Sequence, residues 1–147
     1  MSETLATPIL AVGFGCRQGC SAATLQALLE QSLLTHQIDL TQIKGLASID
    51  GKRQEPGLLE LAQRLNLPLL FFSADELAPY EPGLSHRSSL AFERTGCHGV
   101  AESAALALAE RLGQACASLL ISRQKHPLAT FALAWTGQNP RQSPPPA

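Results

Sequence analysis

The chain has 147 residues, a length that suits one domain with a sizeable hydrophobic core. Its hydrophobic residues make up 45% and its charged residues 16%, the balance of an ordinary globular protein. A net charge of -1 excludes a general attraction to nucleic acid, and no hydrophobic run reaches the ~20 residues that a membrane-spanning helix needs. We therefore expect a cytoplasmic protein with no nucleic-acid and no membrane partner.

Apolar runs of strand length alternate with segments of helical period in the first half of the chain. The run Ile9–Val12 predicts a strand, and the glycine-rich segment Gly13–Ser21 predicts a loop after it. A helix follows, which ends near Gln37. Gly45–Ile49 predicts a second strand, and Pro56 suits the first turn of a second helix. This order is typical of βα units.

The second half continues the alternation and then changes. Its expected elements are a strand at Pro68–Phe72, a capping box formed by Ser73 and Glu76, a helix at Val100–Leu112, and strands at Ser118–Ser122 and Leu128–Trp135 that the basic loop RQKHP joins as a hairpin or short connection. We predict the α/β class: one three-layer domain with a central, mostly parallel sheet of about five strands flanked by helices. The domain would span residues 1–136, and residues 137–147 would form a disordered proline-rich tail.

The segment GFGCRQGCS is the first candidate site. Gly13, Gly15 and Gly19 lie between a strand and a helix, where backbone N–H groups can face an anion. The spacing is not that of a dinucleotide fingerprint, because Gln18 stands where the third glycine belongs, and there is no P-loop lysine. Two hypotheses stay open at this point, an anion-binding loop and a tight turn. A nucleotide- or phosphate-binding regulatory module that uses the Gly13–Gly19 loop is the alternative function.

Charged residues follow the predicted strands. The cations are Arg17, Lys52, Arg53, Arg123 and Lys125. If they share one edge of the sheet, they suit a ligand with several carboxylates, although charges also collect in loops because loops are solvated. Asp50 and Glu55 are candidates for proton transfer, and a surface ion-pair cluster explains them equally well. For Glu102, in the first turn of a helix, the position favours a structural role over a catalytic one.

The four cysteines are expected to be free thiols, because a chain of this size does not need disulfides. Cys16, Cys20, Cys97 and His98 could supply zinc ligands, but their spacing lacks paired CxxC motifs, so we expect no metal. Cys16 lies before a helix and beside a cation, which predicts thiolate character. A zinc or thiol redox protein is therefore a third hypothesis. Cys116 precedes an apolar strand and is expected in the core.

Three segments, taken together and in order, resemble one known family. They are GFGCRQGCSA, GLASIDGKRQEPGLLELAQRLNLPLLFFSADEL and TGCHGVAESAAL. This combination resembles the CobE family, which is homologous to the C-terminal domain of CbiG in cobalamin (vitamin B12) biosynthesis. The similarity runs from about Ile9 to Trp135. It implies an α/β domain that handles tetrapyrrole intermediates of corrin-ring construction, whose acetate and propionate groups agree with a basic edge.

The resemblance also implies a role in the aerobic pathway, as an enzyme or carrier that binds a precorrin-type tetrapyrrole. CbiG-type proteins open the δ-lactone of cobalt-precorrin-5A, so a catalytic role would be a hydrolase- or lyase-like step. No cofactor is expected, and other cobalamin-pathway enzymes are candidate partners. By matching position, the ligand-binding residues would be Gly13, Gly15, Cys16, Arg17, Gly19, Lys52, Gly96, Glu102 and Lys125, and Asp50 or Glu55 would carry any proton transfer.

Overall fold

The computed structural model of the protein describes residues 8–85 and 99–136. Its strands are β1 (Ile9–Cys16), β2 (Ile43–Ile49), β3 (Leu69–Phe72), β4 (Ser118–His126) and β5 (Ala129–Thr136). Its helices are α1 (Ala22–Thr35), α2 (Pro56–Leu65), α3 (Ala74–Leu77) and α5 (Val100–Gly113), with short 3-10 helices at Leu40–Gln42, Asp50–Lys52 and Ala78–Gly83. The α/β class is confirmed.

The five strands form one mixed sheet in the order β3-β2-β1-β5-β4. β1, β2 and β3 are parallel, whereas β5 is antiparallel to both β1 and β4. The prediction of a mostly parallel sheet is therefore wrong, because the hairpin between β4 and β5 can only pair antiparallel strands. Because β5 is antiparallel to both of its neighbours, β4 runs in the same direction as β1. The C-terminal ends of β1, β2, β3 and β4 consequently meet at one edge of the sheet, which we call the carboxyl edge.

Two strands are longer than the sequence indicates. β1 continues through Gly13 and Gly15 to Cys16, so these residues lie in a strand and the loop after it is only Arg17–Ser21. β4 likewise continues to His126 and takes up most of the expected basic loop. The cause is pairing, since β5 matches β1 residue by residue over its whole length. Ladder hydrogen bonds override the low strand propensity of glycine here.

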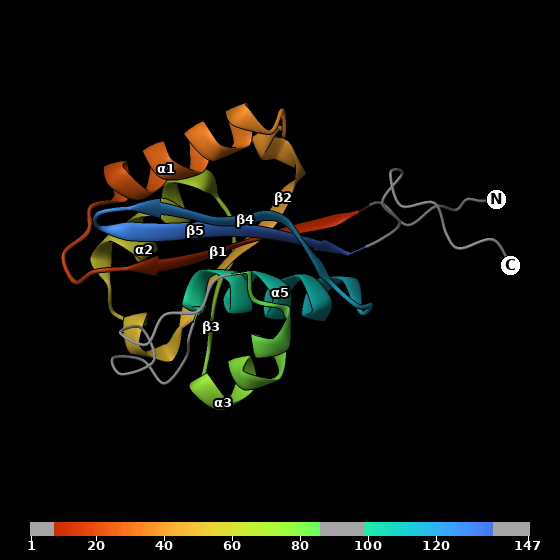
Figure 1. Cartoon of the computed structure of the whole chain (residues 1–147). Helices are drawn as coiled ribbons and strands as arrows, with labels where there is room; N and C mark the ends of the chain where they lie inside the picture. Colours follow the sequence, from red (N-terminus) through yellow and green to blue (C-terminus); the bar gives the residue numbers. More distant parts are fainter. Residues whose placement is uncertain (1–7, 86–98, 137–147) are drawn as a thin grey trace, which may run out of the picture.

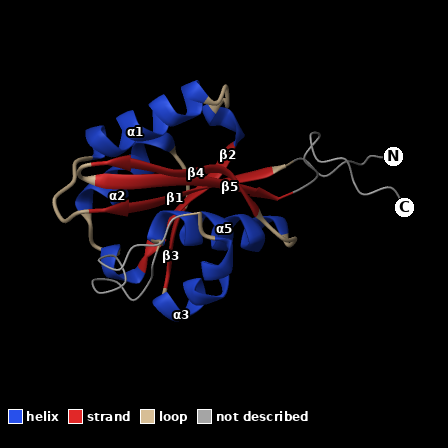
Figure 2. Ribbon diagram, in the orientation of Figure 1, coloured by secondary structure: helices blue, strands red, loops and turns tan. Residues whose placement is uncertain are grey.

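Helices cover both faces of the sheet, as Figures 1 and 2 show. On the face covered by α1 and α2, β1 contributes large side chains, Leu10, Val12 and Phe14. Phe14 packs against Phe131 of the neighbouring strand, with ring centroids 5.8 Å apart. The opposite face, covered by α5 and α3, is built mainly from alanines. The three layers are therefore filled in two different ways.

Small residues let α5 approach the sheet closely. Gly13 faces α5, and a Cβ atom built on it would lie 2.0 Å from the Ala101 carbonyl oxygen and 2.6 Å from the Ala105 nitrogen. Glycine is needed here because the helix backbone packs directly on the strand backbone. As a result, the first turn of α5 lies beneath the carboxyl edge.

Local capping signals fix where the helices begin. The Ser21 side chain accepts a hydrogen bond from the Thr24 N–H (3.1 Å) at the start of α1. Pro56 occupies the first turn of α2. Ser73 and Glu76 exchange the two bonds of a capping box at α3, 2.8 and 3.0 Å long. The predictions for Pro56 and for the Ser73–Glu76 capping box are confirmed. Each of these three helices starts soon after a strand reaches the carboxyl edge.

Several sequence predictions lie outside the described residues. These are the proline-rich tail at 137–147 and the positions of Gly96, Cys97 and His98. In the part of the chain that the structure describes, no helix has the length and apolar character needed to cross a membrane.

Candidate functional site

A cavity of about 650 Å³ opens at the carboxyl edge, where β1, β2 and β3 end. Its walls come from three successive strand ends: Cys16, Arg17 and Gln18 from the first, Ile49, Asp50, Gly51 and Lys52 from the second, and Ser73 and Ala74 from the third. Ligands of open α/β sheets bind at this edge, and the volume lies within the range of small-molecule pockets. We take this cavity as the candidate site.

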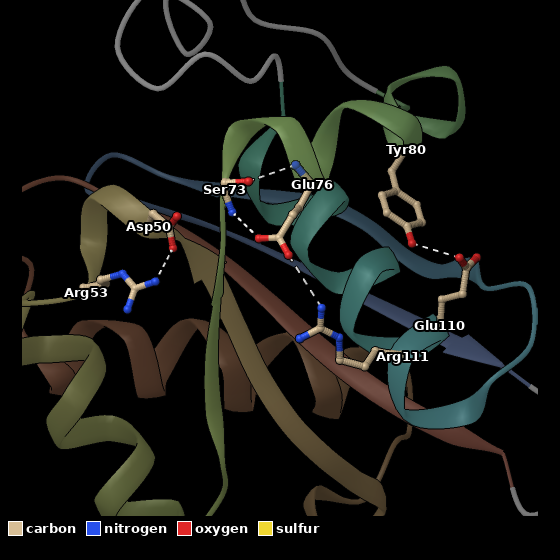
Figure 3. Close-up of polar contacts among 7 residues, drawn as sticks. All are labelled: Asp50, Arg53, Ser73, Glu76, Tyr80, Glu110 and Arg111. Carbon is tan, nitrogen blue, oxygen red and sulfur yellow. Dashed lines mark hydrogen bonds and ion pairs between the residues drawn. The ribbon is translucent and has the colours of Figure 1, made fainter.

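Two cations and one carboxylate of the predicted site line the cavity together. They are Arg17, Lys52 and Asp50. The Asp50 carboxylate forms an ion pair with Arg53 (2.9 Å), as Figure 3 shows. In the described part of the chain, neither Arg17 nor Lys52 has an ion-pair partner within 4.0 Å. Their charges are thus available to an anionic group in the cavity.

The third wall was missed by the sequence prediction. Ser73 lines the cavity, whereas the sequence predicted only a helix-capping role for it. The Glu76 carboxylate that completes the capping box also meets Arg111 of α5 at 3.6 Å (Figure 3), and the Arg111 guanidinium lies 4.8 Å from the centre of the Phe72 ring. The signal that could have found Ser73 is its place at the end of the strand beside β2.

The loop Arg17–Ser21, here called the first loop, is held by its own backbone amides. The Arg17 N–H donates to the Leu128 carbonyl (2.9 Å), and the Cys20 N–H donates to the Arg17 carbonyl (3.1 Å). The Gly19 N–H donates to Glu55 Oε2 (2.8 Å). These three amides are bonded within the protein, so they do not offer the anion cradle that the nucleotide or phosphate hypothesis requires.

Glu55 is buried, with 7% of its surface exposed, and stands at the N-cap of α2. Its side chain makes no capping bond to its own helix and reaches Gly19 instead. Two residues further on, a Cβ atom on Gly57 would lie 2.1 Å from the Cys20 carbonyl oxygen. The start of α2 therefore touches the first loop at two points.

Cys16 does not have the predicted thiolate character. Burial raises the pKa of its thiol to about 12, an effect that nearby Lys52 opposes and nearby Glu55 reinforces. Burial also raises the pKa of Cys20. At neutral pH the Cys16 wall of the cavity is thus a neutral, weakly polar thiol. Cys116 is exposed, so its placement in the core was wrong as well.

Glu102 lies away from the cavity walls, in the first turn of α5, with 1% of its surface exposed. It accepts hydrogen bonds from the N–H groups of Ser85 and Arg123, each 2.8 Å long, and from the Ser85 hydroxyl. Lys125 lies on β4 opposite Thr130, whose partner on β1 is Gly15. Lys125 therefore shares the carboxyl edge but stands two strands from β1.

The described residues contain no group of three histidine, cysteine, aspartate or glutamate side chains that could hold a metal ion. Of the four candidate zinc ligands, Cys16 and Cys20 are free thiols and the other two fall outside the described residues.

Comparison with known proteins gives consistent matches. Residues 10–134 match the family model described as Cobalamin synthesis G C-terminus. The chain is 35% identical over 125 residues to protein CobE of Sinorhizobium sp, covering 85% of this chain and 79% of that protein. It is also 35% identical over 98 residues to the cobalt-precorrin-5A hydrolase of Priestia megaterium, covering 67% of this chain and 26% of the hydrolase. The chain thus spans about a quarter of that hydrolase.

Solved structures agree. A crystal structure of CobE, a protein from the cobalamin biosynthetic pathway, shares 48% sequence identity with a TM-score of 0.87, covering 91% of this chain and 94% of that one. The cobalamin biosynthesis protein chiG from Agrobacterium tumefaciens shares 26% identity with a TM-score of 0.66, covering 86% of this chain and 97% of that one. The chain therefore belongs to the Cobalamin synthesis G C-terminus family of cobalamin biosynthesis proteins.

Proposed function

We propose that this chain binds a polycarboxylated, precorrin-type tetrapyrrole in the cavity at the carboxyl edge. The observation that carries the proposal is the presence of Arg17 and Lys52 on two adjacent walls of one cavity of about 650 Å³. Acetate and propionate groups are carboxylates, and charge-assisted hydrogen bonds to arginine and lysine are the strong contacts for them. The name of the hydrolase relative, a cobalt-precorrin-5A hydrolase, points to the same class of ligand.

The cavity walls suit a large ring with charged side chains. The neutral thiol of Cys16 offers weakly polar surface beside the two cations. An open site formed by three loops can hold one side of a ring and leave the rest accessible. Such a site fits a carrier that passes a labile intermediate to an enzyme of the aerobic pathway.

A catalytic role is the second form of the proposal. It would be a hydrolase- or lyase-like step, by analogy with the hydrolase relatives, of which this chain spans only a part. Asp50 or Glu55 would then transfer the proton. Asp50 lines the cavity, whereas Glu55 does not. Asp50 is thus better placed to reach a bound ligand.

The proposal is tested by titrating the purified chain with precorrin intermediates and following the absorbance of the tetrapyrrole. Lys52→Gln and Arg17→Gln should each weaken binding about tenfold, because each removes one charge-assisted contact. Lys44→Gln is the matched control, since Lys44 is exposed near the start of β2, at the opposite edge of the sheet. If the absorbance does not change and no tetrapyrrole is retained on gel filtration, the proposal fails.

Lys125, another predicted ligand residue, is tested in the same titration. Lys125→Gln should have a smaller effect than Lys52→Gln, because Lys125 is two strands from β1 and outside the cavity walls. Gly96 lies outside the described residues, so its part in binding stays a prediction.

A further inference from the structure

Glu55 is unusual for an N-cap residue. The residues preferred at this position, serine, threonine, aspartate and asparagine, accept a hydrogen bond from the first turn of their own helix. The Glu55 carboxylate instead accepts the N–H of Gly19, which is 36 residues earlier in the chain. Helix α2 therefore starts without a side-chain cap, and the first loop gains a charge-assisted hydrogen bond.

The first loop is attached at both ends. At its beginning the Arg17 N–H is bonded to the Leu128 carbonyl of the turn between β4 and β5. Near its end Gly19, with φ of +83°, presents its N–H to Glu55. Gly57 packs closely against the Cys20 carbonyl, so the start of α2 and the end of the first loop meet at a junction formed by Glu55–Gly19 and Gly57–Cys20. Both Arg17, whose backbone is the first attachment, and Gln18, which lies between the two attachments, line the cavity.

Glu55 also lies behind the loop rather than in the cavity. It is absent from the cavity walls, and only 7% of its surface is exposed. A proton-transfer group must come within hydrogen-bond reach of the bound ligand, directly or through one water. A residue already bonded to the loop backbone is better placed to hold that loop.

We propose that Glu55 is a positioning residue: its carboxylate holds the first loop in the shape that directs Arg17 into the cavity. It does not transfer a proton to or from the ligand. This inference rests on the proposed function for its ligand-binding measurement, but the geometry of the loop can be measured without any ligand. The two ideas can therefore fail separately.

The ligand-free experiment is amide hydrogen exchange of the intact chain. Glu55→Ala should speed exchange at Gly19 and its neighbours in the first loop about tenfold, because the acceptor of a charge-assisted bond is lost. Glu55→Gln should keep most of the protection, since its side-chain oxygen can still accept the bond. The control is Glu60→Ala on the same helix. Glu60 is exposed, and its carboxylate forms an ion pair with the Arg64 guanidinium (2.6 Å) far from the first loop in sequence. Unchanged exchange in Glu55→Ala would overturn the proposal.

The second measurement is tetrapyrrole affinity. Glu55→Ala should weaken binding in parallel with the loss of loop protection, and Glu55→Gln should largely restore it. If the Gln variant is as defective as the Ala variant while its loop remains protected, the carboxylate acts on the ligand and the positioning role is wrong. If the wild-type chain binds no tetrapyrrole but loop exchange follows the prediction, only the proposed function fails.

A third variant disturbs the same junction without changing any carboxylate. Gly57→Ala places a Cβ against the Cys20 carbonyl, so it should raise loop exchange and weaken tetrapyrrole binding as Glu55→Ala does. This variant decides the matter if Glu55→Ala does not fold. Normal loop exchange in a folded Gly57→Ala chain would contradict the proposal that the junction sets the shape of the first loop.

Discussion

Glu55 and Glu102 are both buried glutamates close to the carboxyl edge, and they lie on opposite faces of the sheet. Glu55 precedes α2, and its carboxylate accepts one hydrogen bond, from the Gly19 N–H at 2.8 Å. Glu102 begins α5 and accepts bonds from two backbone N–H groups and one hydroxyl. One carboxylate shapes a wall of the cavity, while the other joins α5 to β4 and to Ser85, which follows the 3-10 helix Ala78–Gly83.

Each glutamate is accompanied by a glycine at a point of close backbone contact. Gly57 meets the Cys20 carbonyl on the α2 side, and Gly13 meets the Ala101 carbonyl on the α5 side. The α5 contact involves the central strand, whereas the α2 contact involves a loop. The comparison indicates that the Glu102 and Gly13 contacts fix α5 on the sheet, whereas the Glu55 and Gly57 contacts fix the first loop beside the candidate site.

The largest effect is expected from Glu102→Ala. It removes a buried carboxylate that accepts bonds from two backbone N–H groups and one hydroxyl. We expect a loss of roughly 3 kcal/mol in the free energy of unfolding, measured by urea denaturation. Glu110→Ala is the control on the same helix, because Glu110 accepts one bond, from the Tyr80 hydroxyl (2.9 Å). Equal losses in the two variants would contradict the structural role of Glu102 and weaken the contrast between the faces.

Gly13→Ala should have the next largest effect. The added methyl group meets helix backbone that cannot move without shifting α5, so we expect a loss of about 2 kcal/mol or more in the free energy of unfolding. Gly51→Ala is the matched control, since a Cβ there would meet nothing within 4 Å. Thermal or urea denaturation compares the two. A Gly13→Ala chain as stable as the control would show that the α5 face tolerates expansion.

The smallest effect concerns the Cys16 thiol and leaves the fold intact. Iodoacetamide reacts with the thiolate, and a pKa near 12 means that little thiolate exists at pH 8. Alkylation of the Cys16 peptide, followed by mass spectrometry, should therefore be slow at pH 8 and rise as the pH approaches 12. The exposed Cys116 and the urea-unfolded chain provide the comparison. Rapid labelling of Cys16 at pH 8 in the folded chain would show that the cavity exposes a thiolate.

Much of the local structure could be predicted because local chemistry decides it. Ser21, Pro56 and Ser73 mark the first turns of three helices through capping and backbone geometry. The presence of Arg17 and Lys52 on one cavity also follows from sequence, since both residues come directly after parallel strands. The failures came where distant segments meet, as in the ends of β1 and β4.

The sequence by itself determined the order of strands and helices along the chain, the helix starts and the edge of the sheet at which the candidate cavity lies, because these depend on residue periodicity and on neighbours in the chain. Only the tertiary structure decided the mixed sheet, the neutral thiol of Cys16 and the different tasks of two buried glutamates. Strand direction depends on pairing across the sheet, a thiol pKa depends on burial, and the partner of a buried carboxylate is set by packing between segments far apart in sequence. None of these quantities is local.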